Sequence, residues 1–138
     1  MILDRFSERF LKIWVDIMAT NSIEHSRKNS SASVSARQTL TLLTPDEVSE
    51  SSIQFWIIDV QNPRYLTHRL PVAQRLTEAQ ILCDIPKAQL ILLTCLVGDR
   101  SLKMGYRLLR LGYRQIYVLQ GGIVAWRNAG YRLERYSP

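Results

Sequence analysis

The amino-acid sequence predicts an α/β fold of three layers, in which helices flank a mostly parallel central sheet. Three observations predict this class. Short apolar runs, such as the one that ends at residue 94, are continuously hydrophobic, as are strands buried on both faces. Helical patterns separate these runs, as crossovers between parallel strands require. Glycines and helix caps mark the boundaries between the elements.

The first 21 residues are expected to form an amphipathic helix outside this domain. Residues 1–18 have an apolar face at three- and four-residue steps. We expect this helix to dock on its own domain or to mediate self-association. Its charges cancel, so attraction to anionic lipid would be weak. Residues 22–37 contain six serines, which is typical of a flexible linker. The α/β domain is thus assigned to residues 38–138.

Four strands are predicted in this domain, at residues 39–43, 55–60, 88–94 and 115–119. Thr44 is the expected cap of a helix that begins at Pro45 and carries Glu47 three residues after the cap. A second helix is predicted over residues 101–111, ending at Gly112, and a last one over residues 122–129, ending at Gly130. The second helix is expected to bury Leu102, Leu108, Leu109 and Leu111.

Composition narrows the functional classes. Of the 138 residues, 46% are hydrophobic, enough to bury a core, and no apolar run is long enough to cross a bilayer. With no secretory segment visible, we expect a cytoplasmic protein. Two cysteines alone cannot form a disulfide framework or a four-ligand zinc site, so no metal and no cofactor are expected.

The positive charge lies in the C-terminal part of the chain. Residues 1–54 carry six Lys/Arg against seven Asp/Glu, whereas residues 55–138 carry twelve against five. This balance suits small anions or an acidic protein partner. Nucleic-acid binding is not expected, because no aromatic residues interleave the basic ones in a recognisable module. The basic residues of the second helix and the turn after it are Lys103, Arg107, Arg110 and Arg114.

Cys95 is the candidate nucleophile. It lies between a predicted buried strand and a helix, and ligands bind at the carboxyl ends of strands in such sheets. Backbone N–H groups of a tight loop can converge on its sulfur, and the helix start and Arg100 add positive charge. Gly98 permits the turn, and Ser101 could cap the helix. Together these features favour a nucleophilic thiolate over an inert buried cysteine.

The segment that contains Cys95 resembles the active-site loop of single-domain rhodaneses. Residues 95–101 (C-L-V-G-D-R-S) match the C-x-x-G-x-R-S loop of that family. Residues 57–60 resemble the family's strand that ends in Asp-Val-Arg, and residues 65–73 resemble its Tyr-x-x-Gly-His-Ile-x-Gly-Ala stretch. Residues 111–113 and 118–126 are similar to its closing Gly-Tyr, Val-Leu-x-Gly-Gly and Ala-Trp motifs. The resemblance covers about residues 39–134 and implies a rhodanese-like three-layer fold.

This resemblance implies a sulfurtransferase. Cys95 would take sulfane sulfur from thiosulfate, a small-thiol persulfide or a protein persulfide, and pass it to a thiol acceptor. The loop residues that would form the substrate and anion cradle are Leu96, Val97, Gly98, Asp99, Arg100 and Ser101. Asp59 would be a structural residue behind the site, and His68 and Arg69 are further candidates near it. The C-x4-R loop is one residue shorter than the C-x5-R loop of related phosphatases, so phosphate-ester hydrolysis is not expected.

Several residues depart from the family pattern. Gln61 replaces the arginine of Asp-Val-Arg, Val72 replaces a glycine, and the segment around His68 is one residue short. Leu96 and Val97 are apolar, and Asp99 brings a negative charge that repels thiosulfate. We therefore expect thiosulfate to be a poor donor.

Two alternatives remain open. Cys83 is expected to be buried and structural, although it could be a resolving thiol. The chain could also be a rhodanese-like module that is catalytically weak or inactive and binds a protein partner.

Overall fold

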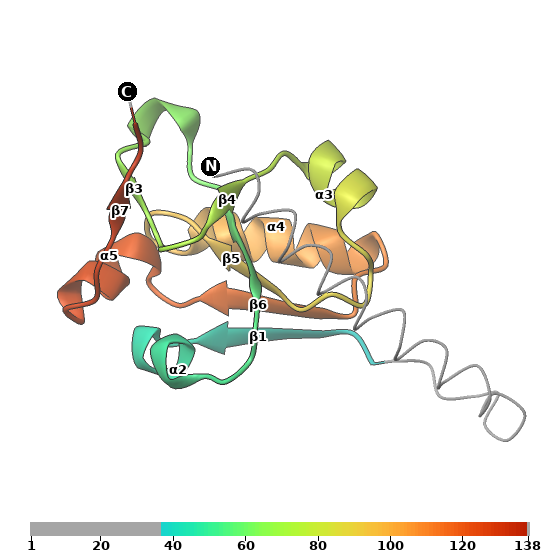
Figure 1. The fold of residues 1–138 in the computed structure, drawn as a ribbon. Coiled ribbons are helices and arrows are strands. Elements are labelled where there is room, and N and C mark those ends of the chain that lie inside the picture. Colours follow the sequence, from blue (N-terminus) through green and yellow to red (C-terminus); the bar gives the residue numbers. More distant parts are fainter. Residues whose placement is uncertain (1–36, 138) are drawn as a thin grey trace, which may run out of the picture. The chain divides into compact units, whose positions relative to one another are not determined.

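The computed structural model describes residues 37–137, and these contain two sheets. The main sheet has five parallel strands in the order β1-β6-β5-β2-β4, and β3 pairs with β7 in a small antiparallel sheet (Figure 1). The strands are β1 (Thr39–Leu43), β2 (Trp56–Asp59), β3 (His68–Arg69), β4 (Gln74–Arg75), β5 (Ile91–Thr94), β6 (Gln115–Leu119) and β7 (Glu134–Arg135). The predicted parallel sheet is confirmed.

Helices cover both faces of the main sheet, which gives the predicted three layers. They are α2 (Pro45–Glu50), α3 (Glu78–Asp84), α4 (Asp99–Arg110) and α5 (Gly122–Asn128), with a 3-10 turn at Pro63–Tyr65. Helix α4 packs on β1, β5 and β6. A Cβ at Gly105 of α4 would lie 2.8 Å from Leu40 Cδ1, so this glycine lets the helix approach the sheet closely.

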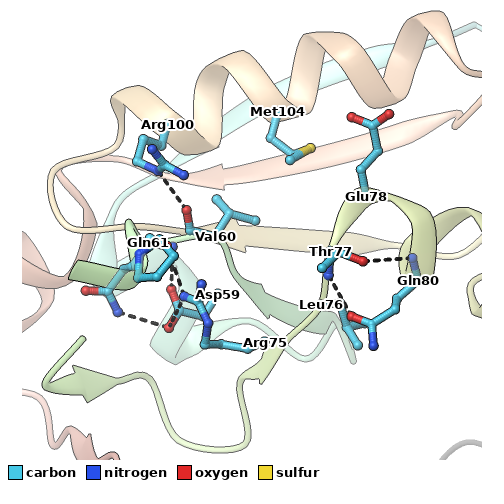
Figure 2. Close-up of a pocket in the computed structure, with 11 residues that line it drawn as sticks. Asp59, Val60, Gln61, Arg75, Leu76, Thr77, Glu78, Gln80, Arg100 and Met104 are labelled. Carbon is cyan, nitrogen blue, oxygen red and sulfur yellow. Dashed lines mark hydrogen bonds and ion pairs between the residues drawn. The ribbon is translucent and has the colours of Figure 1, made fainter. Parts of the chain in front are cut away.

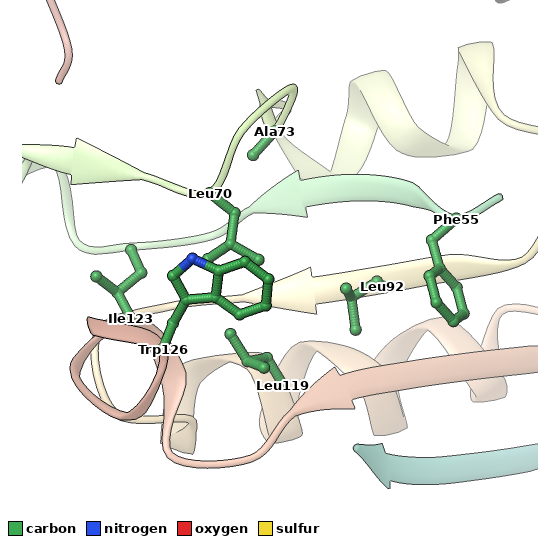
Figure 3. Close-up of a cluster of buried hydrophobic side chains, with 7 residues drawn as sticks. All are labelled: Phe55, Leu70, Ala73, Leu92, Leu119, Ile123 and Trp126. Carbon is green, nitrogen blue, oxygen red and sulfur yellow. The ribbon is translucent and has the colours of Figure 1, made fainter. Parts of the chain in front are cut away.

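The core on the opposite face gathers around α5 (Figure 3). Trp126 and Ile123 of α5 pack there with side chains from the strands and from the connections between them. The cluster comprises Phe55, Leu70, Ala73, Leu92, Leu119, Ile123 and Trp126. Every residue of β5 is buried, as its continuous apolar run predicts.

The helix boundaries follow the predicted caps except at α4. Thr44 Oγ accepts from the N–H of Glu47, and Pro45 is the first helical residue, as expected. Helix α4, however, begins at Asp99 and Gly98 is its N-cap residue, so the prediction that Ser101 caps it is wrong. Gly98 has a left-handed φ of +101°, which a residue without Cβ adopts at little cost. Ser101 lies in the first turn, and its hydroxyl is buried without a hydrogen-bond partner among the described residues.

Predictions about individual side chains are also corrected. Of the four leucines predicted to be buried by this helix, only Leu108 is fully buried. Leu102 and Leu109 are half-buried, and Leu111 follows the end of α4 and is 39% exposed, because the buried face runs through Ser101, Gly105 and Leu108. Cys83 is exposed, because α3 turns only Ile81 fully into the core.

The predicted N-terminal helix and serine-rich linker lie outside the described residues. Within residues 37–137, none of the helices has the length and apolar character needed to cross a membrane.

Candidate functional site

The candidate site lies where three parallel strands end. Cys95 follows β5 directly, between the ends of β2 and β6. In the register, Thr94 of β5 is paired with Asp59 of β2, and the N–H of Val60 donates to the Thr94 carbonyl at 2.8 Å. The carboxyl ends of parallel strands meet at one edge of a sheet, so Val60 and Cys95 are brought side by side at that edge.

Two backbone N–H groups of the loop donate to the sulfur of Cys95. The N···Sγ distance is 3.0 Å for Gly98 and 3.4 Å for Ser101. Both groups belong to the start of α4, where unpaired N–H dipoles carry partial positive charge. The site can therefore stabilise negative charge on this sulfur. Cys95 itself has 0% exposure, so a reactant must pass the loop surface to reach it.

The first turn of α5 holds the back of the loop. Ile123 N donates to the Cys95 carbonyl at 2.9 Å, and Val124 N donates to the Leu96 carbonyl at 3.1 Å. A Cβ at Gly122 would lie 2.5 Å from both of these carbonyl oxygens, and its φ is +63°. Only glycine fits so close to the loop. The Gly-Gly segment thus supports the Cys95 loop through its backbone.

Among the described residues, the side chains of the loop form no hydrogen bond with the sulfur. Arg100 Nε donates to the Val60 carbonyl at 3.0 Å and ties the loop to the end of β2. Among residues 37–137, no carboxylate forms an ion pair with Arg100. Leu96 and Val97 are 45% and 53% exposed, and Asp99 is also exposed. The outer surface of the loop is thus apolar with one negative and one positive charge, those of Asp99 and Arg100.

Asp59 is buried at the end of β2 and serves as a hydrogen-bond acceptor there. Its carboxylate accepts from the backbone N–H of Gln61 at 2.9 Å, from Gln61 Nε2 at 3.0 Å and from the Tyr136 hydroxyl. Arg75 Nη1 lies 3.8 Å from it. Burial and this hydrogen bond to Asp59 raise the pKa of Tyr136 above its ordinary value. Gln61, at the position of the family's arginine, therefore fixes the Asp59 turn.

His68 and Arg69 form β3, which pairs with β7 in the small sheet. The His68 ring is near Thr67 Oγ1 at 3.1 Å. Arg69 pairs with Glu134 at 3.5 Å and lies over the Tyr136 ring, 5.0 Å from its centre. In the described part of the chain, neither side chain forms a hydrogen bond or an ion pair with the Cys95 loop.

A cleft of about 280 Å³ lies beside the loop, between α3 and α4 (Figure 2). We call it the α3–α4 cleft. Its walls include Val60, Leu76, Glu78, Arg100 and Met104. The cleft shares Arg100 with the Cys95 loop, although the sulfur itself does not line it. Across residues 37–137, no cluster of three or more His, Cys, Asp or Glu residues could hold a metal ion.

Part of this site could not be found from local sequence signals. The Val60 carbonyl, the Tyr136 hydroxyl and Arg75 all support the site, but none belongs to a catalytic motif. The only signal for Gly122 is the Gly-Gly pair itself, because glycine permits close approach of the backbone.

Comparisons with known proteins agree with this architecture. No curated protein matches the chain. Among solved structures, the chain is similar to a rhodanese-like domain protein of Staphylococcus aureus, with 25% identity, coverage of 70% of this chain and 99% of that one, and a TM-score of 0.56. A rhodanese-related protein of Thermoplasma volcanium matches with 18% identity, coverage of 68% and 97%, and a TM-score of 0.58.

A third structure, from Rhodopseudomonas palustris, is described as a protein of unknown function and possible tyrosine phosphatase. It has 20% identity, coverage of 69% of this chain and 85% of that one, and a TM-score of 0.57. The sequence profile of the rhodanese-like domain matches residues 44–129, which span both the Cys95 loop and the Gly-Gly segment that supports it. The chain therefore belongs to the rhodanese-like domain family.

Proposed function

We propose that this protein is a sulfurtransferase that carries sulfane sulfur as a persulfide on Cys95. The observation that carries the proposal is the pair of N–H groups from Gly98 and Ser101 on the Cys95 sulfur, 3.0 and 3.4 Å away. Donors placed where negative charge resides lower the energy of a thiolate and of the leaving thiolate in the second half-reaction. The rhodanese-like family includes sulfurtransferases, which supports the same chemistry.

The proposed reaction has two balanced steps. The Cys95 thiolate attacks the outer sulfur of a donor persulfide, the donor S–S bond breaks, and its electron pair leaves on the donor thiolate. An acceptor thiolate then attacks the outer sulfur of the Cys95 persulfide, and the electron pair of that S–S bond returns to Cys95 Sγ. No external oxidant or general base is needed once both thiols are ionised.

The loop surface favours a persulfide donor over thiosulfate. Leu96 and Val97 present apolar side chains, and exposed Asp99 repels a dianion. A donor must also pass these side chains, because Cys95 is fully buried. We propose a small-thiol or protein persulfide as the donor and a thiol as the acceptor.

The test is the intact mass of the protein after exposure to sodium polysulfide. Because Cys83 is exposed and would also take up sulfur, the Cys83→Ser variant is the proper background. In that background we expect a gain of sulfur that dithiothreitol reverses and that Cys95→Ser abolishes. Equal uptake with and without Cys95 would contradict the proposal.

One observation favours a second function. The burial of Cys95 beneath exposed Leu96 and Val97 also suits a module that binds a partner through this surface without turnover. The exposed basic residues Lys103 and Arg110 of α4 would suit an acidic protein. If iodoacetamide modifies Cys95 in the Cys83→Ser background no faster than an unperturbed buried thiol, the binding function is the better one.

A further inference from the structure

Arg100 lines the α3–α4 cleft and, among the described residues, has no carboxylate partner for its positive charge. Glu78 pairs with Arg107, and Asp59 is surrounded by Gln61 and Arg75 as donors. Arg100 uses its Nε for the Val60 carbonyl, and within the described residues it has no carboxylate partner. The terminal nitrogens of its guanidinium are planar donors that suit a carboxylate.

Apolar surface adjoins this cation inside the cleft. Met104 lies one helical turn after Arg100 on α4, about 6 Å along the helix axis. Figure 2 shows both side chains on the α4 wall, with Glu78 of α3 reaching toward that helix from the other side. A ligand that places its anionic group at Arg100 would meet apolar surface there, and its stem could run along the Val60 side of the cleft toward the Cys95 loop. The volume of about 280 Å³ suits a small molecule.

The cleft is next to the reacting sulfur. Arg100 belongs to the Cys95 loop, and the carbonyl that it contacts belongs to Val60, which directly follows strand β2 next to β5. Neighbouring strands are roughly 5 Å apart, so a thiol of a few carbon atoms held in the cleft could extend toward the mouth of the loop.

We propose that the α3–α4 cleft binds the small-molecule acceptor, and that this acceptor is an aliphatic thiol with a carboxylate, which Arg100 holds. This proposal rests on the proposed function, because it assigns a site to the acceptor of the second step. The acceptor thiolate attacks the outer sulfur of the Cys95 persulfide, the S–S bond breaks with its electron pair going to Cys95 Sγ, and the acceptor leaves as a persulfide.

Two thiols of equal length test the carboxylate. The Cys83→Ser protein is loaded with polysulfide, and its discharge is followed by intact mass with 3-mercaptopropionate or with 3-mercaptopropan-1-ol, each corrected for its thiolate fraction. We expect the carboxylate thiol to discharge the persulfide about tenfold faster at low concentration, the effect of a charge-assisted hydrogen bond. Equal rates would overturn the proposal.

Charge substitutions at Met104 locate the carboxylate without altering the loop. Met104→Lys should raise the rate ratio of the two thiols about threefold, and Met104→Glu should lower it by the same factor, as expected for a charge roughly 6 Å away. Leu111→Lys and Leu111→Glu are the matched controls, because Leu111 is exposed beyond the far end of α4. They should leave the ratio unchanged. Equal effects at both positions would overturn the proposal that the carboxylate binds in the cleft, because the net charge of the protein would then explain the change in the ratio.

Failure of the proposed function gives a different result. If the protein takes up no sulfur on Cys95, the sulfurtransferase proposal fails, and the cleft is tested by binding alone. Isotope-labelled protein is then titrated with 3-mercaptopropionate under reducing conditions. Chemical-shift changes at the amides of Gln61, Arg100 and Met104 that Met104→Glu weakens would support the cleft, and their absence would overturn it.

Discussion

The packing of Gly122 against the Cys95 loop predicts a large effect of one added methyl group. In Gly122→Ala the new Cβ would lie 2.5 Å from the carbonyl oxygens of Cys95 and Leu96, so backbone must move. A left-handed φ costs an alanine about 1–2 kcal/mol. Displacing the loop also weakens the hydrogen bonds from Ile123 and Val124, at about 0.5–1.5 kcal/mol each. The free energy of unfolding should therefore fall by about 2–5 kcal/mol.

Gly130→Ala is the matched control for this prediction. Gly130 also has a positive φ, +88°, but a Cβ there would meet nothing within 4 Å. It should show only the conformational cost of about 1–2 kcal/mol. Urea unfolding measures both variants, and iodoacetamide modification of Cys95 in the Cys83→Ser background reports on the loop. Gly122→Ala should change the modification rate and Gly130→Ala should not. Equal destabilisation and equal rates would refute the claim that Gly122 supports the site.

Three further predictions address the donor, the core and alkaline pH. Asp99→Asn removes a negative charge, so it should raise the rate of sulfur uptake from thiosulfate about two- to fivefold and leave uptake from polysulfide nearly unchanged. Mass spectrometry measures both rates, and an equal gain with both donors would contradict charge repulsion. Leu92→Ala should cost about 2–5 kcal/mol in urea unfolding because Leu92 is fully buried, whereas exposed Leu111→Ala should cost much less. Burial, with a smaller effect of Cys83, raises the pKa of Tyr113 to about 12. The folded protein then holds this proton more tightly than the unfolded chain, in which the tyrosine pKa is about 10. The free energy of unfolding should therefore fall as the pH rises from about 10 to about 12, and Tyr113→Phe should reduce this fall.

Elements with a strong local signal could be predicted from the sequence. The strand at Thr39–Leu43 was predicted with its observed bounds, because apolar and β-prone residues end there at a capped helix. The run that ends at Thr94 is buried at every position of its strand, as its uninterrupted hydrophobicity indicates. The same apolar run predicts that Cys95 lies at the carboxyl end of a central strand. For these elements local sequence and tertiary packing favour the same structure.

Features that depend on distant packing could not be predicted in this way. The two-residue strands of the small sheet have no periodicity to detect, and His68 lies in one of them because the C-terminal segment pairs with it. Tyr136 reaches Asp59 from 77 residues away, which no local motif records. Cys83 was expected to be buried because free cysteines usually are, yet its side of α3 faces outward.

The direction of Arg100 connects loop length with the kind of chemistry the loop can perform. An arginine that points into its own loop can clamp a tetrahedral anion over the nucleophile. Here the Nε of Arg100 donates outward to the Val60 carbonyl, and the sulfur receives backbone N–H groups from Gly98 and Ser101 instead. Those two donors suit the single charge of a thiolate or a persulfide, whereas a phosphate ester would bring a dianion whose several oxygens need more donors than these two at the sulfur. The geometry thus gives a physical reason for the expectation, first based on loop length, that this loop handles sulfur rather than phosphate.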